Sequence, residues 1–182
     1  MLGTVVYAGE PGAFGEAASR QRFPHGRPVG LPKFSDVADA IADRRASHGL
    51  IPVRNSRAGA VPGAGDILRD PRLRVVEQFA LPIVMHCVGL PGTVLAGVRI
   101  VRSHPVALAQ CGRFLAAIAV AAVPTGDTAL AARQVREGGD PTVAALASAR
   151  AAQLHGLAIL AAKVQDDPDT TTTFAVLARA GA

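Results

Sequence analysis

Short apolar runs alternate with segments of helical periodicity along the whole chain. Residues 4–7, 48–53 and 143–147 are apolar runs of the length expected for buried β-strands. Between the first two, residues 34–45 carry Phe34, Val37 and Ile41 at the spacing of an amphipathic helix. We expect further strands at residues 75–80, 83–89, 98–101, 120–123, 158–160 and 174–177, and further helices at 13–21, 105–116, 128–136 and from 149 onward. This alternation predicts an α/β fold with mainly parallel sheets.

Two of the expected strands meet at Leu81-Pro82, which predicts a crossover between two lobes. Apart from the acidic and threonine-rich residues 166–173, no repeat or low-complexity linker divides the 182 residues, so we expect a single domain. The first lobe is expected to contain about residues 1–77 and 157–182, and the second lobe about residues 78–156.

Composition excludes several classes of protein. Hydrophobic residues make up 49% of the chain and charged residues 18%, which excludes a disordered chain. The most apolar run, residues 114–123, is too short to cross a bilayer. The N-terminus lacks the basic region and the apolar segment of a signal peptide. We therefore expect a cytoplasmic protein without a membrane segment.

The net charge of +5 favours an acidic small molecule over a nucleic acid as the partner. The arginines are scattered, no run of four basic residues occurs, and seven aromatic residues offer little stacking surface. Cys87 and Cys111 are too few for a disulfide framework, so we expect two reduced, buried thiols.

Several expected strands end in a small polar residue that begins a helix. Ser103 follows a strand and precedes Pro105, and Gln110 lies two helical turns further on, so we expect Ser103 to cap this helix with Gln110 on the same side. The same arrangement recurs at Asp127-Thr128, at Ala147-Ser148 and near Ala13. Helix N-termini attract carboxylates, so such ends gathered at the carboxyl edge of a sheet predict an anion-binding cleft. Ordinary helix capping explains any one of them equally well.

Seven segments carry a likeness to one enzyme family. The chain opens with YAGEPGAFGEAA, and the loop around residue 55 reads IPVRNSRAGAV. There follow LPIVMHCVGLPG, SHPVALAQC, DTALAA, AALASARAAQLHGL and VQDDPDTTTTF. In this order and spacing they resemble the catalytic domain of prephenate dehydratases over nearly the whole chain. The resemblance implies two α/β lobes similar to type 2 periplasmic-binding-protein lobes, an active site in the cleft between them, and a homodimer.

The resemblance also implies roles for individual residues. Thr172 matches the threonine of the family's Thr-Arg-Phe motif, which acts on the leaving hydroxyl as a general acid. Because a threonine hydroxyl is a weak acid, it is expected to act by hydrogen bonding and proton relay in a dry site. The implied catalytic residues are Thr172, Ser103 and Asn55. The implied substrate-binding residues are Ser56, Gln110, Thr128, Arg54, Thr173, Phe174, Ala13 and Ser148, with Phe174 packing beneath the site.

Two positions depart from the family pattern. Thr173 stands where the motif has arginine, and Arg54 stands where the Asn-Ser loop has glutamate. We expect the two positions to lie near each other across the cleft, so that a guanidinium has moved from one wall to the other. Tolerated drift, or replacement by Arg57, is the alternative. The chain ends shortly after the last motif, so neither the regulatory ACT domain nor a phenylalanine-feedback site is expected.

These departures bear on the choice between two reactions of prephenate. If an acid helps the ring hydroxyl to leave, loss of CO2 gives phenylpyruvate; otherwise a ring carbon is protonated and a dihydro-4-hydroxyphenylpyruvate forms. The altered motif and the missing ACT domain are similar to the non-aromatising prephenate decarboxylases of antibiotic pathways, which is the leading prediction. A prephenate dehydratase of phenylalanine biosynthesis is the alternative, because Thr172 is retained. A non-catalytic prephenate-binding module is the second alternative.

Other reactive residues do not form a known motif. His86, Cys87, His104 and Cys111 match no zinc-ligand spacing, and neighbours on a strand point to opposite faces. No Gly-x-Ser-x-Gly elbow accompanies Ser56, and residues 9–12 lack the glycine spacing of a dinucleotide loop. We therefore expect neither a metal nor a cofactor.

Overall fold

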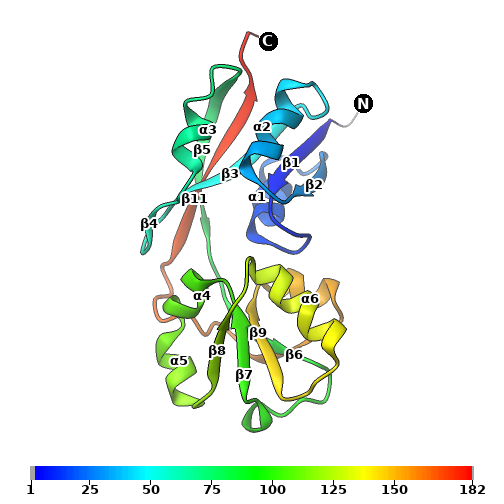
Figure 1. Cartoon of the computed structure of the whole chain (residues 1–182), viewed down its shortest axis with the longest axis vertical. Helices are drawn as coiled ribbons and strands as arrows, with labels where there is room; N and C mark the ends of the chain where they lie inside the picture. Colours follow the sequence, from blue (N-terminus) through cyan, green and yellow to red (C-terminus); the bar gives the residue numbers. More distant parts are fainter. Residues whose placement is uncertain (1–2, 182) are drawn as a thin grey trace. The chain divides into compact units, whose positions relative to one another are not determined.

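Two β-sheets, each in its own unit, organise the structure, a computed structural model that describes residues 3–181 (Figure 1). Unit 1 contains the described residues up to Glu10, Phe14–Ile83 and the residues from Thr170 onward. Unit 2 contains Pro11–Ala13 and Val84–Asp169. After Ile83 the chain crosses into unit 2, and it returns to unit 1 at Thr170 for its last strand.

Unit 1 is built on a mixed sheet with the strand order β2-β1-β3-β11-β5, and β4 pairs with β3. β1, β2 and β3 are parallel, whereas β11 runs antiparallel to both β3 and β5. The elements are β1 (Thr4–Ala8), α1 (Phe14–Arg22), β2 (Arg27–Leu31), α2 (Phe34–Ala42), β3 (His48–Asn55), β4 (Gly59–Ala60), α3 (Ala64–Leu68), β5 (Leu73–Pro82) and β11 (Thr171–Arg179).

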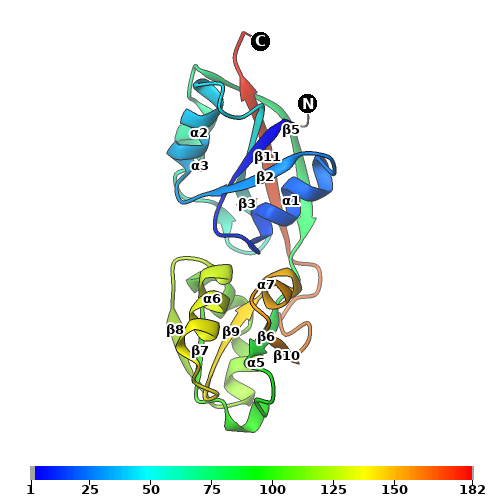
Figure 2. The same ribbon diagram turned by 90° about the vertical axis from the view of Figure 1, so that its right-hand side faces the viewer.

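Helices cover both faces of the unit 1 sheet (Figure 2). Val6 of β1 belongs to the buried cluster that α2 and α3 form with the central strands. Its neighbour Tyr7 points to the opposite face, where α1 approaches so closely that a Cβ at Gly15 would lie 2.9 Å from the tyrosine ring. Because β3 and β11 are buried from both sides, they contain continuous apolar runs and not the alternation of polar and apolar residues that is typical of a half-exposed strand.

Unit 2 is built on a second mixed sheet with the strand order β10-β6-β9-β7-β8. β9, β7 and β8 are parallel, and β6 runs antiparallel to β9 and β10. The elements are β6 (His86–Gly89), the 3-10 helix η1 (Leu95–Gly97), β7 (Ile100–Ser103), α4 (Pro105–Gln110), α5 (Gly112–Ala117), β8 (Ala121–Pro124), α6 (Thr128–Gly138), β9 (Val143–Ala147), α7 (Ala149–Leu154) and β10 (Ala158–Ala161).

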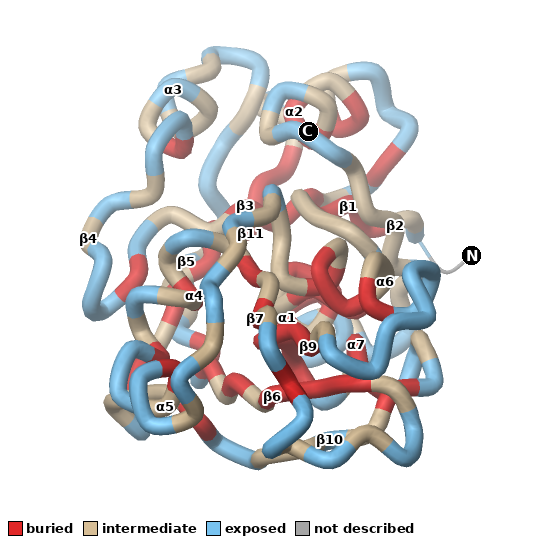
Figure 3. The backbone as a smooth tube through the Cα atoms, turned by 60° about the horizontal axis from the view of Figure 1, so that its bottom comes forward, coloured by how far each residue is buried: buried red, intermediate tan, exposed pale blue. Residues whose placement is uncertain are grey.

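Alanine dominates the core between this sheet and helices α6 and α7. Of the 11 buried residues in the cluster, eight are alanines, and Figure 3 shows the buried stretches along α6 and β9. Short side chains let the helices lie close to the strands, so the core tolerates little added volume. Ala13 belongs to this cluster, which explains why the loop residues Pro11–Ala13 belong to unit 2.

The predicted α/β class is confirmed, but the prediction of mainly parallel sheets is wrong. Each sheet joins a parallel half to an antiparallel half, because β11 and β6 run against their neighbours. The unit boundaries also differ from the expected lobes, since residues 78–83 lie in unit 1 and residues 157–169 in unit 2. Within residues 3–181, no helix is both long enough and apolar enough to cross a membrane.

Candidate functional site

Asn55 and Thr172 form a buried hydrogen-bonded pair in unit 1. They are register partners on the antiparallel strands β3 and β11, so their side chains lie on the same face of the sheet. The Asn55 amide Nδ2 donates to the Thr172 hydroxyl oxygen Oγ1 at 3.1 Å. Their exposed fractions are only 8% and 9%, which makes this a dry site in which a hydrogen bond is electrostatically stronger than in water.

The loop that follows β3 fixes the orientation of the Asn55 side chain. Its carbonyl oxygen Oδ1 accepts the backbone N–H groups of Arg57 at 2.9 Å and Ala58 at 3.0 Å. Because these donors require an oxygen, the NH2 group must be the one that faces Thr172. The Thr172 hydroxyl accepts this bond, so its single proton is left for another acceptor. Thr172 is therefore oriented as a hydrogen-bond donor.

Ser56 joins the same two chain segments. Its backbone N–H donates to the carbonyl of Thr171 at 2.9 Å, and its hydroxyl oxygen accepts the backbone N–H of Thr171 at 3.0 Å. The residue is exposed, so its hydroxyl proton is accessible to a ligand. The structure thus brings Asn55, Ser56 and Thr172 together at one end of the β3–β11 pair.

Arg54 and Thr173, the two positions that depart from the family pattern, are also register partners on β3 and β11. We expected the two residues to lie near each other, which is correct. We also expected them on opposite walls of a cleft, which is wrong. They belong to neighbouring strands of one sheet, one residue along from Asn55 and Thr172. Since side chains alternate along a strand, Arg54 and Thr173 lie on the opposite face from the Asn55–Thr172 hydrogen bond.

Phe174 is packed into the core of unit 1. It is 2% exposed, and its ring stacks on Phe79 of β5 with ring centroids 6.3 Å apart. The register between β11 and β5 shifts after Val176, so the Phe174–Phe79 pair lies in the regular part of the ladder that includes Thr172. Phe174 is therefore a core residue of unit 1 that lies two residues along β11 from Thr172.

In unit 2, the carboxyl ends of the parallel strands β8, β7 and β9 lie at one edge of the sheet. β7 ends at Ser103, β9 is followed directly by Ser148, and β8 is followed by the turn that leads to Thr128. The predicted gathering of strand ends is present, and such an edge is where ligands bind in parallel α/β sheets.

Three of the helices at this edge carry their own side-chain caps. The Asp127 carboxylate accepts the backbone N–H groups of Ala129 and Leu130 at the start of α6. The Ser148 hydroxyl accepts the N–H of Ala151 at 3.0 Å, and the His104 ring accepts the N–H of Val106 at 3.2 Å. Ordinary capping therefore satisfies several of the N–H groups that were predicted to receive carboxylates.

Ser103 was predicted to cap α4, and this prediction is wrong. The cap of α4 is His104, and Ser103 is fully buried with its hydroxyl donating to the Leu146 carbonyl of β9 at 2.7 Å. This bond joins β7 to β9, which favours a structural role over direct contact with a ligand. The sequence signal for the true cap is Pro105, which prefers the first helical position and so identifies the residue before it.

Of the other predicted site residues in unit 2, two are buried and two are partly exposed. Ala13 is a 5% exposed core residue, and Ser148 is 7% exposed and donates to the Gly12 carbonyl at 2.7 Å. Gln110 and Thr128 are half-buried at the end of α4 and the start of α6. Gln110 does not lie two turns along a helix from Ser103, because α4 starts only at Pro105.

The ionisable groups near these residues offer no metal site and no activated thiol. Among the residues that the structure describes, no three or more His, Cys, Asp or Glu side chains lie close enough together to hold a metal ion. Cys87 and Cys111 are free and buried, and burial raises the pKa of each thiol to about 12. The prediction of two reduced, buried thiols is confirmed.

The sequence is similar to one enzyme family over almost its whole length. Residues 5–182 match the family model described as "Prephenate dehydratase". The chain is 36% identical over 176 residues to arogenate dehydratase/prephenate dehydratase 1 of Arabidopsis thaliana, covering 96% of this chain and 45% of the relative. It is 37% identical over 177 residues to a bifunctional N-acyl-homoserine lactone acylase/prephenate dehydratase of Komagataeibacter europaeus, covering 96% of this chain and 62% of the relative.

Solved structures show the same similarity. Prephenate dehydratase from Arthrobacter aurescens in complex with L-Phe superposes with a TM-score of 0.90 at 28% identity, over 98% of this chain and 61% of that one. The lipoprotein Tp32 from Treponema pallidum, with a TM-score of 0.50 at 13% identity over 99% of this chain and 84% of that one, shares the fold alone. The chain thus spans less than half of the plant relative and about three fifths of the Komagataeibacter and Arthrobacter proteins.

Proposed function

This chain belongs to the prephenate dehydratase family, and from that membership we propose that it is a lyase that removes carbon dioxide and water from prephenate to give phenylpyruvate. The observation that carries the proposal is the Asn55–Thr172 hydrogen bond, which leaves the proton of a buried hydroxyl available at the position of the family's general acid.

The reaction needs one proton, and the position that receives it decides the product. The bond between the ring and its carboxylate breaks, CO2 leaves, and the electron pair enters the ring. If the ring hydroxyl is protonated, its C–O bond breaks, water leaves and the ring becomes aromatic. One prephenate dianion and one proton then give one phenylpyruvate anion, CO2 and water. In this proposal Thr172 donates a hydrogen bond to the leaving oxygen and relays the proton, because its own pKa is too high for it to act as a free acid.

The location of the two sequence departures supports dehydration. Arg54 and Thr173 lie on the opposite face of the β3–β11 pair from the Asn55–Thr172 bond, so the departures leave that bond in place. The loop bonds that orient Asn55 come from the backbone of Arg57 and Ala58 and do not depend on the side chain of residue 54. The acid group is therefore intact although the motif around it has changed.

We propose that a substrate carboxylate is bound by the exposed hydroxyl of Ser56, next to Asn55, and that Arg54, on the opposite face from the Asn55–Thr172 bond, attracts the dianion through its charge. Within the described residues the Arg54 guanidinium has no carboxylate partner, so its positive charge is not neutralised by the protein. Gln110 and Thr128 of unit 2 remain candidates because both are partly exposed. Thr173 is proposed to act only through its position beside Arg54. The buried side chains of Ser103, Ser148, Ala13 and Phe174 are proposed to support the structure around the site without contacting the substrate.

Non-aromatising decarboxylation is the second candidate function. It is favoured by the same pair of departures, because arginine at position 54 and threonine at position 173 remove a carboxylate and move the cation by one strand. If this displaces the leaving hydroxyl from Thr172, a ring carbon takes the proton instead and a dihydro-4-hydroxyphenylpyruvate forms. The pathway would then belong to secondary metabolism.

The purified protein incubated separately with prephenate and with arogenate tests the proposal. Arogenate is included because the name of the Arabidopsis relative contains both substrates. Proton NMR and mass spectrometry should show phenylpyruvate from prephenate, or phenylalanine from arogenate, with release of CO2. A dihydro-hydroxy product would favour the second candidate, and unchanged substrate that nevertheless binds would favour a binding module.

The proposal also includes a cytoplasmic homodimer without a nucleic-acid partner. The dimer is supported by the resemblance to the family, in which these domains pair. The absence of a nucleic-acid partner is supported by the scattered arginines, which form no basic run in the sequence. Sedimentation at micromolar concentration should give twice the monomer mass of 18.6 kDa, and a monomer at every concentration would contradict this part of the proposal.

A further inference from the structure

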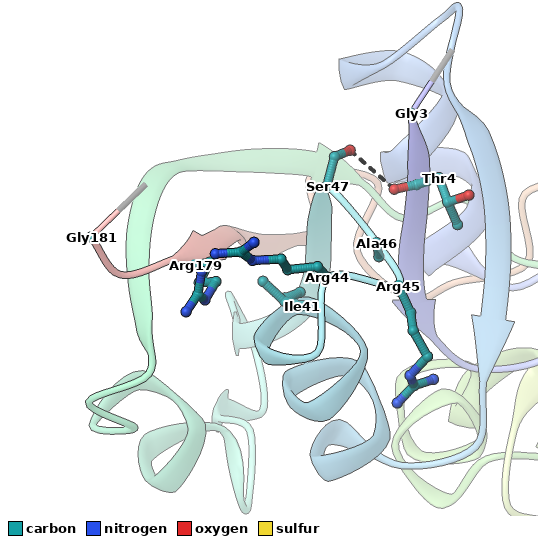
Figure 4. A pocket seen from close by; sticks show the side chains of 9 residues that line it. All are labelled: Gly3, Thr4, Ile41, Arg44, Arg45, Ala46, Ser47, Arg179 and Gly181. Atoms are coloured by element: carbon teal, nitrogen blue, oxygen red, sulfur yellow. Dashed lines mark hydrogen bonds between the residues drawn. The ribbon is translucent and has the colours of Figure 1, made fainter. Parts of the chain in front are cut away.

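A pocket lies in unit 1, between the end of α2, the start of β1 and the end of β11 (Figure 4). Its volume is about 490 Å³, enough for a small organic molecule. Arg44 and Arg179 contribute the charged wall, and Ile41 and Ala46 contribute apolar surface. None of these residues belongs to the candidate active site.

The two arginines are unpaired cations in one pocket. None of the nine lining residues is acidic. Across residues 3–181, neither the Arg44 nor the Arg179 guanidinium has an ion pair or a hydrogen bond to another side chain. Figure 4 shows the Arg44 side chain extending across Ile41 toward Arg179. Two like charges held in this way repel each other, and an anion between them would remove that repulsion.

Arg45 provides an internal contrast. It lines the same pocket, but its guanidinium points away from Arg179 in Figure 4. It pairs with the Asp43 carboxylate at 3.4 Å. Of these two consecutive arginines, Arg45 therefore has a carboxylate partner, whereas Arg44 faces the unpaired Arg179.

Arg44 occupies a backbone conformation that favours glycine. Its φ of 60° is left-handed, and it directly follows Asp43, the C-cap of α2. Glycine is the usual residue after a helix C-cap, because any Cβ is strained in that conformation. The positive charge next to a helix C-terminus is favourable in itself. The guanidinium does not bond the last carbonyls of α2, however, but extends toward Arg179.

We propose that this pocket binds a small molecule with a phosphate or carboxylate oxyanion group between Arg44 and Arg179. Arginine suits this role because its planar fork makes two parallel hydrogen bonds to such a group. The apolar side chains of Ile41 and Ala46 would contact the body of the ligand. The site lies in unit 1 alone and does not depend on the reaction proposed above.

NMR titration of the whole protein with inorganic phosphate, and separately with succinate, tests the proposal at constant ionic strength. The backbone amides of Arg44, Ser47 and Arg179 should shift in a saturable way. Arg44→Asn keeps a residue that tolerates a left-handed backbone, and Arg179→Gln keeps the strand. Each should weaken binding about ten-fold or more, since each removes a charge-assisted pair of hydrogen bonds. Arg45→Gln, which removes the same charge, should bind within about two-fold of the wild type.

The two anions distinguish the ligand groups. Saturation by phosphate alone supports a phosphate group, saturation by succinate alone supports a carboxylate ligand, and saturation by both supports a general oxyanion site. No saturable shift with either anion overturns the proposal. Equal affinity in all three variants, or shifts that map away from this pocket, also overturns it. Prephenate turnover by the Arg44→Asn variant should match the wild type, which separates this site from the proposed active site.

Discussion

Arg54 and Thr173 are direct register partners on β3 and β11, one residue along from the hydrogen-bonded pair Asn55 and Thr172. The two pairs face opposite sides of the same strands. A guanidinium on residue 54 therefore lies about 5 Å, one strand spacing, from the position it would have on residue 173. The departures from the family pattern change the charge on one face, while the acid group on the other face keeps its partners.

Removing the Thr172 hydroxyl tests its role as the acid group. Thr172→Val should lower kcat for phenylpyruvate formation about 100-fold or more, in the range typical of general acid catalysis. It should also cost about 1–3 kcal/mol of unfolding free energy, because the buried Asn55 amide loses its acceptor. Thr172→Ser keeps the hydroxyl and should retain most of the activity. Steady-state kinetics and urea unfolding measure both effects, and full activity in the valine variant would make Thr172 structural.

Exchanging the charges of the Arg54–Thr173 pair tests substrate binding. Arg54→Glu should raise the KM for prephenate about 10-fold, because reversing this charge weakens the electrostatic attraction of the protein for the dianion. Adding Thr173→Arg should restore much of this loss, since the arginine returns on the adjacent strand and on the same face. The product should stay phenylpyruvate in all variants. A product that changes with the charge pattern would show that these positions select the reaction.

Ser148 is predicted to stabilise unit 2 through two hydrogen bonds. It caps α7 through the N–H of Ala151 and donates to the Gly12 carbonyl, which holds the loop before α1 against this helix. Ser148→Ala should lower the unfolding free energy by about 1–2 kcal/mol. The matched control is Ser35→Ala, at an exposed position, which should change it by less than about 0.5 kcal/mol. Equal effects of the two substitutions in thermal unfolding would contradict this assignment.

The buried thiols are predicted to be inert in the folded protein. Burial raises the pKa of Cys87 and Cys111 from 9.0 to about 12, so at pH 8 the thiolate population is about a thousand-fold smaller than in the unfolded chain. Because the folded pKa is raised, the stabilising contribution is complete below pH 9 and is lost as the pH rises toward 12. A thiol-reactive dye at pH 8 should label both residues rapidly in urea and slowly without it. Rapid labelling of the native protein would contradict their burial.

Local sequence patterns predicted most of the elements and the helix starts, because those features depend on neighbouring residues. β2 was missed because Pro28 and Gly30 interrupt its apolar residues. Residues 105–116 were expected to form one helix, but the helix breaks at Cys111, and the Asp166 carboxylate accepts the backbone N–H of Arg113 at the start of α5. That partner lies 53 residues away in sequence, so no local pattern predicts it.

The resemblance implied which residues form the candidate site, but no sequence pattern predicted how they are arranged. The resemblance identified Asn55 and Thr172, whereas their pairing depends on β11 returning antiparallel to β3 after more than 100 residues. The same long-range register places Arg54 beside Thr173 instead of across a cleft. Ser103 was predicted to cap α4, but the cap is His104, and the Ser103 hydroxyl joins β7 to β9; its implied role at the site stays a prediction.

The central claim, that the proton goes to the leaving oxygen and not to the ring, is tested most directly by running the reaction with prephenate in D2O. Mass spectrometry and NMR of the product should show phenylpyruvate whose aromatic ring carries no deuterium. A dihydro-4-hydroxyphenylpyruvate with one deuterium on a ring carbon would contradict the account.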